Sequence, residues 1–123
     1  MKTLLVEQES MSSFLSSHAF LSHGYEVDST EDIEHAWTLL LQNRYYYDLV
    51  VLSVDLPNQG ALNLLRRLRN QGYKTAAVLL GRRGSGPLDS EFAELGATYK
   101  LEQPFDFEEL SRAMGDIKQI GYA

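Results

Sequence analysis

The stretch DLVVLSVDLP, residues 48–57, decides the fold of this 123-residue chain. Its first half is a run of branched apolar residues, which is typical of a strand that is buried on both faces. Its second half turns polar and stops at a proline, which favours a loop after the strand. Open α/β sheets bind their ligands at the carboxyl ends of such strands. Ser53 and Asp55 are therefore the first candidate site residues.

The same pattern recurs along the whole chain. Four further apolar runs predict strands at residues 3–7, 25–29, 75–81 and 97–101. Helical periodicity predicts five helices between and after the strands, at about 9–23, 31–43, 61–71, 88–95 and 107–119. The helix over 31–43 is the clearest of them, because its apolar residues fall on a single stripe. Glycines follow the first, third and fourth of these helices, as is common at helix ends.

Five strands that alternate with five helices predict an α/β fold with a doubly wound, five-stranded parallel sheet. The length is that of one domain, residues 1–123. In such a sheet the functional crevice lies at the carboxyl ends of the strands. This rule directs attention to four places: Glu7 with Gln8, Ser53, Gly81 and Gln103.

The composition excludes several kinds of protein. The chain has no cysteine, which rules out disulfides, thiolate metal sites and cysteine nucleophiles. Its net charge of −6 argues against direct binding to nucleic acid. Arg66, Arg67 and Arg69 stand among leucines at helical spacing, which predicts a solvated helix face. No apolar run approaches the roughly 20 residues of a spanning helix. We therefore expect a cytoplasmic protein with no membrane partner.

Four segments, taken in order, resemble the receiver domains of bacterial response regulators. They are LLVEQES (4–10), YYYDLVVLSVDLP (45–57), AAVLLG (76–81) and GATYKLEQPF (96–105). The resemblance covers nearly the whole chain and implies a CheY-like, flavodoxin-like (βα)5 fold with strand order 2-1-3-4-5. It also implies a role in two-component signal transduction, in which an aspartate of the receiver accepts a phosphoryl group from a histidine kinase.

The chemistry of the family depends on five side chains. An acidic pair helps to hold Mg²⁺ beside the phosphoacceptor aspartate, and a hydroxyl and a lysine bind the phosphoryl group. The resemblance places the acidic pair on Glu7 and Gln8, the phosphoacceptor on Ser53, the hydroxyl on Gly81 and the lysine on Gln103. Only Glu7 keeps the side chain that the family pattern requires.

These departures predict a degenerate phosphorylation pocket. The Ser53 hydroxyl is a weak nucleophile without a base beside it, and His18, His23 and His35 fall in or beside the first two helices. Gln8 leaves a poor site for Mg²⁺, so we expect weak or absent Mg²⁺ binding and no other cofactor. Because acceptor and lysine are lost together, we expect that neither charge is left buried without the other. We also expect no catalytic residue and no enzyme activity.

The resemblance also implies positions for the conformational switch and for partner binding. Phosphorylated receivers move a hydroxyl and an aromatic ring together, and these positions fall on Gly81 and Lys100, which carry neither group. Receivers dimerise or dock effectors through their fourth helix, last strand and last helix. In this chain that face would contain Glu91, Glu94, Tyr99, Lys100 and Arg112.

The leading hypothesis is an atypical receiver that acts through phosphorylation-independent protein–protein interaction. Its partner would be another protein, a second copy of the chain, or a covalently linked effector domain after about residue 119. Two alternatives stay open. The receiver still takes a phosphoryl group on Asp55 or Ser53, or it senses a nucleotide or another anion through the GRRGSGP loop (81–87), which carries Arg82 and Arg83. An unrelated enzyme of flavodoxin-like architecture is disfavoured, because no nucleophile–base pair is present.

Overall fold

A computed structural model describes residues 2–8, 11–22, 24–42, 46–82, 84–103, 105 and 108–113, with the side chains of 11–16 excepted. It contains five parallel strands in one sheet with the order β2-β1-β3-β4-β5. The strands are β1 (Lys2–Val6), β2 (Glu26–Thr30), β3 (Leu49–Ser53), β4 (Ala76–Arg82) and β5 (Ala97–Gln103). The predicted fold class and strand order are confirmed.

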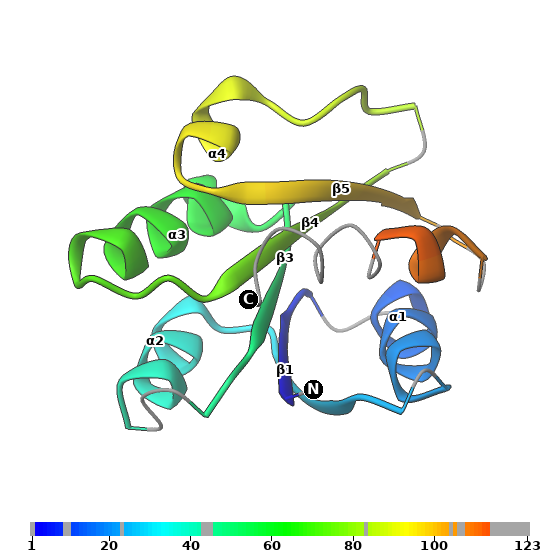
Figure 1. The fold of residues 1–123 in the computed structure, drawn as a ribbon, viewed down its shortest axis with the longest axis horizontal. Helices are drawn as coiled ribbons and strands as arrows, with labels where there is room; N and C mark the ends of the chain where they lie inside the picture. Colours follow the sequence, from blue (N-terminus) through cyan, green and yellow to red (C-terminus); the bar gives the residue numbers. More distant parts are fainter. Residues whose placement is uncertain are drawn as a thin grey trace.

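Helices cover both faces of the sheet, as Figure 1 shows. They are α1 (Met11–Ser22), α2 (Ile33–Gln42), the short 3₁₀ helix η1 (Pro57–Gln59), α3 (Gly60–Asn70) and α4 (Ser90–Glu94). Residues 108–113 are also helical, and the rest of the predicted last helix lies outside the described residues. None of the described helices has the length and apolar character needed to cross a membrane.

The strands separate two hydrophobic cores, because successive side chains of a strand point to opposite faces. Leu4, Val50 and Leu79 belong to the core under α2 and α3, whereas Leu5 and Val51 belong to the core under α1 and residues 108–113. All five residues of β3 are buried, as expected for the central strand of a sheet that is covered on both sides.

Strand β5 is longer than the sequence predicts. It continues two residues beyond the predicted end at Leu101, because Glu102 and Gln103 stay in register with Gly81 and Arg82 of β4. A register shift near Thr98 precedes this pairing. As a result, Lys100 and Glu102 share one face of β5, and Leu101 and Gln103 share the other.

The prediction that the arginines of α3 form a solvated face is wrong for Arg69. Its Nε atom donates to the Leu95 carbonyl at 2.6 Å, and its Nη1 atom donates to the Tyr73 carbonyl at 2.9 Å. Burial lowers the pKa of the guanidinium. Arg69 thus ties α3 to the turn that precedes β5, whereas Arg66 is exposed and forms only a loose ion pair with Glu91 at 3.9 Å.

The connection between β3 and α3 contains two consecutive residues in the left-handed region, Asn58 with φ of 58° and Gln59 with φ of 54°. Asparagine adopts this conformation readily, but glutamine does so only at a cost of about 1–2 kcal/mol. The strained residue stands six positions after Ser53, in the loop that follows the predicted site.

Replacing Gln59 with glycine is expected to raise the free energy of unfolding by up to about 1 kcal/mol, because glycine adopts positive φ without steric cost. Urea denaturation measures this change. The matched control is Gln71→Gly, since Gln71 is exposed with φ of −90°. That control is expected to lower stability, and equal effects of the two substitutions would contradict the strain at Gln59.

Candidate functional site

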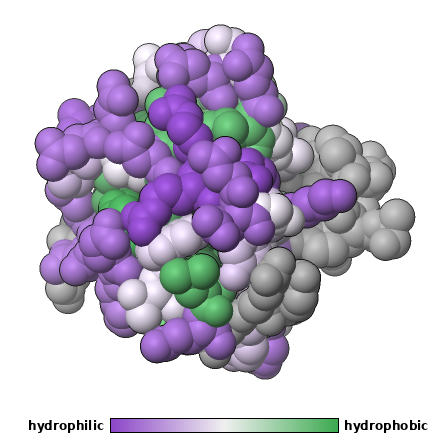
Figure 2. Space-filling view, turned by 90° about the vertical axis from the view of Figure 1, so that its left-hand side faces the viewer, coloured by the Kyte–Doolittle hydropathy of each residue, from purple (hydrophilic) through white to green (hydrophobic). Residues whose placement is uncertain are grey.

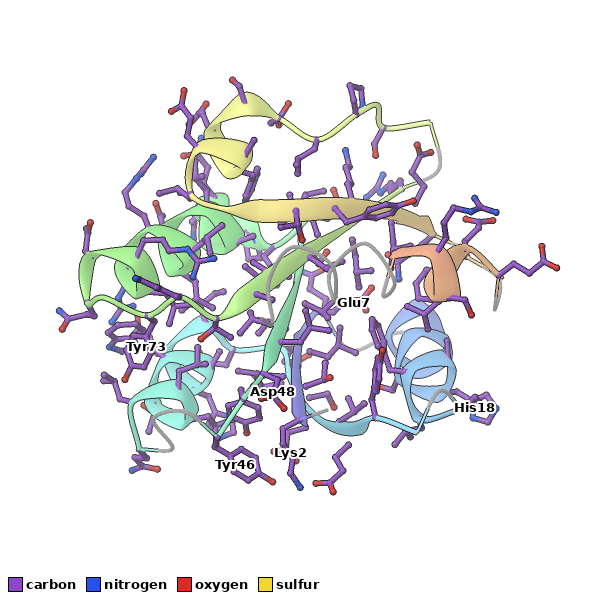
Figure 3. The ribbon with its side chains drawn as sticks, viewed as in Figure 1. Lys2, Glu7, His18, Tyr46, Asp48 and Tyr73 are labelled. Atoms are coloured by element: carbon purple, nitrogen blue, oxygen red, sulfur yellow. The ribbon has the colours of Figure 1, made fainter. Side chains whose placement is uncertain are left out.

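Three of the predicted site residues meet at the carboxyl end of the sheet. Glu7 follows β1, Ser53 ends β3 and Gln103 ends β5. Each stands two residues after a member of the core under α1, namely Leu5, Val51 and Leu101. By the alternation of strand side chains, all three therefore belong to the same face of the sheet. Figure 3 shows Glu7 at the opposite end of β1 from Lys2 and Asp48.

Glu7 is a buried carboxyl group with 6% of its surface exposed. Its Oε1 atom accepts a hydrogen bond from Nε2 of Gln103 at 2.9 Å. Its Oε2 atom is shielded from solvent and has no hydrogen-bond partner among the described residues. Burial raises the pKa of Glu7, and the negative charge of Asp55 adds to this effect, while the bond from Gln103 opposes it.

Ser53 is buried, and its hydroxyl forms a hydrogen bond with the nearby backbone. The Oγ atom accepts a hydrogen bond from the Asp55 amide at 3.2 Å. Asp55 is exposed, and its Oδ2 atom lies 3.2 Å from Nε of Arg82. The Ser53 hydroxyl thus caps the turn that leaves β3, and the nearby carboxylate pairs with an arginine of β4.

Gln8 lies outside the buried pocket that contains its neighbour Glu7. Gln8 is exposed and lines a hollow of about 620 Å³ that also includes the first turn of α2, Asn58 and Arg67. Within that hollow Arg67 is already paired with Glu34 at 3.0 Å. The two positions predicted as an acidic pair therefore face different surroundings.

Gly81 and Lys100 lie together on the face of the sheet opposite to Glu7. A Cβ atom added at Gly81 would stand 2.5 Å from Cε of Lys100 and 2.7 Å from Oγ of Ser85. The long side chain of Lys100 thus occupies the space that a side chain at position 81 would need. The two predicted switch positions are in contact, and the lysine fills the gap that the glycine leaves.

Three residues of the predicted interaction face, Tyr99, Lys100 and Arg112, line one hollow beside β5. This hollow of about 430 Å³ is lined by Tyr99, Lys100, Leu101, Glu102, Glu108, Glu109 and Arg112. Tyr99 also packs against the core under α1. Glu91 and Glu94 are exposed on α4 and do not line this hollow. In contrast, the side of the molecule that carries α2 and α3 is mostly hydrophilic, with hydrophobic areas that are small and separate (Figure 2).

Among the residues that the structure describes, no three histidine, aspartate or glutamate side chains are grouped so that they could hold a metal ion. The two carboxylates nearest to Ser53 also have other partners. Glu7 accepts from Gln103 and Asp55 pairs with Arg82. Glu7, Ser53 and Gln103 lie at the carboxyl ends of strands of one parallel sheet, where open α/β sheets bind their ligands.

Comparison with known proteins identifies the class. Residues 3–114 match the family described as "Response regulator receiver domain", so this chain belongs to that family. It is 35% identical over 95% of its length to the two-component response regulator PhoP of Pseudomonas aeruginosa, of which it covers 51%. It is 32% identical over 98% of its length to the transcriptional regulatory protein TcrA of Mycobacterium tuberculosis, of which it covers 47%. The chain spans about half the length of these relatives.

Solved structures agree with this assignment. The receiver domain of the TMAO respiratory system response regulator TorR aligns over 98% of both chains with a TM-score of 0.79 and 23% identity. The chemotaxis protein CheY4 of Vibrio cholerae aligns over 93% of this chain and 95% of its own, with a TM-score of 0.78 and 27% identity. The chain is a receiver domain of a two-component response regulator and acts in signal transduction.

Several contacts of the site are not visible in the local sequence pattern. The Glu7–Gln103 bond joins residues that are 96 positions apart, and the Arg82–Asp55 pair joins residues that are 27 positions apart. The only sequence signal for the first contact is the placement of both residues at strand ends in the same predicted pocket. No signal in the sequence indicates that Lys100 lies over Gly81.

Proposed function

We propose that this receiver domain signals through protein–protein interaction without being phosphorylated and without Mg²⁺. The observation that carries the proposal is the hydrogen bond from the Gln103 amide to the buried Glu7 carboxyl at 2.9 Å. By the resemblance to the family, Gln103 stands where a lysine would contact the phosphoryl group. An uncharged amide that is already bonded to Glu7 gives little electrostatic help to phosphoryl transfer.

The other predicted pocket positions support the same proposal. Ser53 supplies a hydroxyl in place of the acceptor carboxylate, and that hydroxyl accepts a hydrogen bond from the Asp55 amide. A serine needs a neighbouring base to act as a nucleophile. His35, in the first turn of α2, has its Nδ1 atom 3.0 Å from the hydroxyl of Thr30 at the end of β2. The domain is therefore proposed to have no enzyme activity.

The donor set does not fit the Mg²⁺ ion that the family implies. This hard cation prefers several oxygen ligands in octahedral geometry. Here Gln8 lines a different hollow, and Asp55 pairs with Arg82. Burial raises the pKa of Glu7, which disfavours the ionised carboxylate that a metal ion needs. No step of the proposed function passes through a metal ion.

Backbone amide NMR tests the proposal. We expect no saturable shifts at residues 7–8, 53–55, 81 and 103 when Mg²⁺ and then beryllofluoride, a phosphoryl mimic, are added. Incubation with Mg²⁺ and a small phosphodonor is expected to leave the intact mass unchanged. Saturable shifts together with a mass increase of one phosphoryl group would contradict the proposal. Asp55→Asn and Ser53→Ala would then show which residue accepts the group.

The partner is proposed to be a protein that contacts the face formed by α4, β5 and residues 108–113, or an effector domain that is linked to the chain. Relatives such as PhoP and TcrA are named as regulators, and they are about twice as long as the chain. A homodimer through the same face is the second form of this proposal. Sedimentation velocity of the purified chain distinguishes them, because only a homodimer associates with no other protein present. If a dimer forms, Arg112→Glu is expected to weaken it.

The structure gives less support to the anion-sensing alternative. The guanidinium of Arg82 is paired with Asp55, and the Gly84 amide donates to the Glu102 carboxylate at 2.5 Å. An anion in this loop would have to displace two carboxylates of the same charge. Thermal stabilisation by nucleotides would nevertheless restore this alternative, since a ligand at about 100 times its Kd adds about 2.7 kcal/mol.

A further inference from the structure

Two side chains of β5, Lys100 and Glu102, lie next to the point where the connection between β4 and α4 begins. After Gly84 the chain runs back along the length of β5 before it reaches α4 (Figure 1). Lys100 and Glu102 are two residues apart on β5, so their side chains belong to the same face of the strand. Glu102 contacts the beginning of this connection, and Lys100 contacts Gly81 of β4, shortly before the connection begins.

The first contact is steric and lies at Gly81. The Cε atom of Lys100 stands 2.5 Å from the position that a Cβ atom would take on Gly81, and Oγ of Ser85 stands 2.7 Å from the same position. The alkyl chain of a lysine packs on apolar or backbone surface while its ammonium stays near solvent. Lys100 and Ser85 thus meet over a glycine that leaves room for both.

The second contact is a charge-assisted hydrogen bond. The Gly84 amide donates to Oε2 of Glu102 at 2.5 Å, and the Ser85 amide donates to the Arg82 carbonyl at 2.9 Å. The positive φ of Gly84, 85°, permits the turn that points its amide toward β5. Arg82 adds an ion pair with Asp55 across the strand ends, although at 83% exposure its side chain contributes little to this attachment.

We propose that Lys100 and Glu102 form a latch that holds Gly84 and Ser85, at the start of the β4–α4 connection, in one position without a phosphoryl group. The latch rests on the proposed function and deepens it, because it proposes what fixes the start of this connection when no phosphoryl group is bound. The connection leads directly into α4, which carries Glu91 and Glu94 of the predicted interaction face. A fixed connection would present that face to a partner at all times.

Amide hydrogen exchange followed by NMR tests the latch. Glu102→Gln removes the charge from the acceptor of the Gly84 amide, and we expect exchange of that amide to become about five-fold faster, because a neutral acceptor makes a weaker hydrogen bond than a charged one. Lys100→Ala uncovers Gly81 and is expected to accelerate exchange at Gly84 and Ser85 as well. The amides of Val51 and Val78 report whether each variant stays folded.

Glu94→Gln is the matched control, since it removes the same charge from an exposed position of α4. It is expected to leave the exchange of residues 82–86 unchanged. If Glu102→Gln and Lys100→Ala behave as this control does, within two-fold, the latch is overturned. This result is separable from the proposed function, because beryllofluoride binding is measured on the wild type at other residues.

Discussion

Replacing Glu7 with glutamine is expected to raise the free energy of unfolding at neutral pH by roughly 1–3 kcal/mol, because burial penalises the ionised carboxylate and the amide carries no charge. The Oε2 atom of Glu7 is buried without a hydrogen-bond partner among the described residues, while Oε1 accepts from Gln103. A neutral amide keeps the shape and the bond to Gln103 but carries no charge. Urea denaturation of both proteins measures the difference.

The effect of this substitution is expected to depend on pH. Burial raises the pKa of Glu7 above its ordinary value of 4.5, so the folded protein holds this proton more tightly than the unfolded chain. The stability that this proton contributes is complete below the ordinary pKa and is lost as the pH rises through the raised one. Glutamine does not titrate, so its advantage over the wild type should grow as the pH rises from about 4.5.

Glu94→Gln serves as the control for the pH series, because it removes a carboxylate from an exposed site. A pH-independent difference between Glu7→Gln and the wild type would show that the Glu7 carboxyl is not desolvated. A complementary variant is Gln103→Lys, which places a cation beside Glu7. It is expected to lower the pKa of Glu7 and to remove most of the pH dependence.

Replacing Arg69 with alanine is expected to lower the free energy of unfolding by about 2–4 kcal/mol. The substitution removes two hydrogen bonds from a guanidinium and leaves the carbonyls of Leu95 and Tyr73 without these donors. It also removes the connection between α3 and the turn before β5. Thermal and urea denaturation followed by circular dichroism measure the loss.

The chain offers two matched controls for this prediction. Arg66→Ala removes an arginine of the same helix whose ion pair with Glu91 is exposed, and it is expected to change stability by less than about 1 kcal/mol. Arg69→Lys keeps the charge but cannot make both bonds in the same geometry, so an intermediate loss is expected. If the two alanine variants are equally stable, the buried contacts of Arg69 do not stabilise the fold.

The order and type of the strands and helices were predictable because they depend on local patterns. The apolar run of residues 49–52 can only be accommodated in a strand that is covered on both faces. The stripe on α2 places Ala36 and Leu40 in the core. The ends of β5 were less predictable, because Glu102 and Gln103 are polar and enter the strand only through their pairing with β4.

The candidate site was predicted as a set of positions, and its contacts were not. The sequence placed Glu7, Ser53 and Gln103 at strand ends, and the structure brings Glu7 and Gln103 into hydrogen-bond contact. It also separates Gln8 from Glu7 and joins Gly81 to Lys100. Adjacent residues of an extended chain point in opposite directions, so a pair in sequence need not form a pair in space.

The sequence by itself determined the fold class and the family, because periodicity and residue type are local properties of the chain. The tertiary structure decided which side chains of the predicted site come into contact. Glu7 is left buried beside an amide, Arg69 bonds carbonyls from two separate segments, and Lys100 fills the space over Gly81. These outcomes depend on burial and on distances between residues far apart in the chain, which exist only after the strands have assembled.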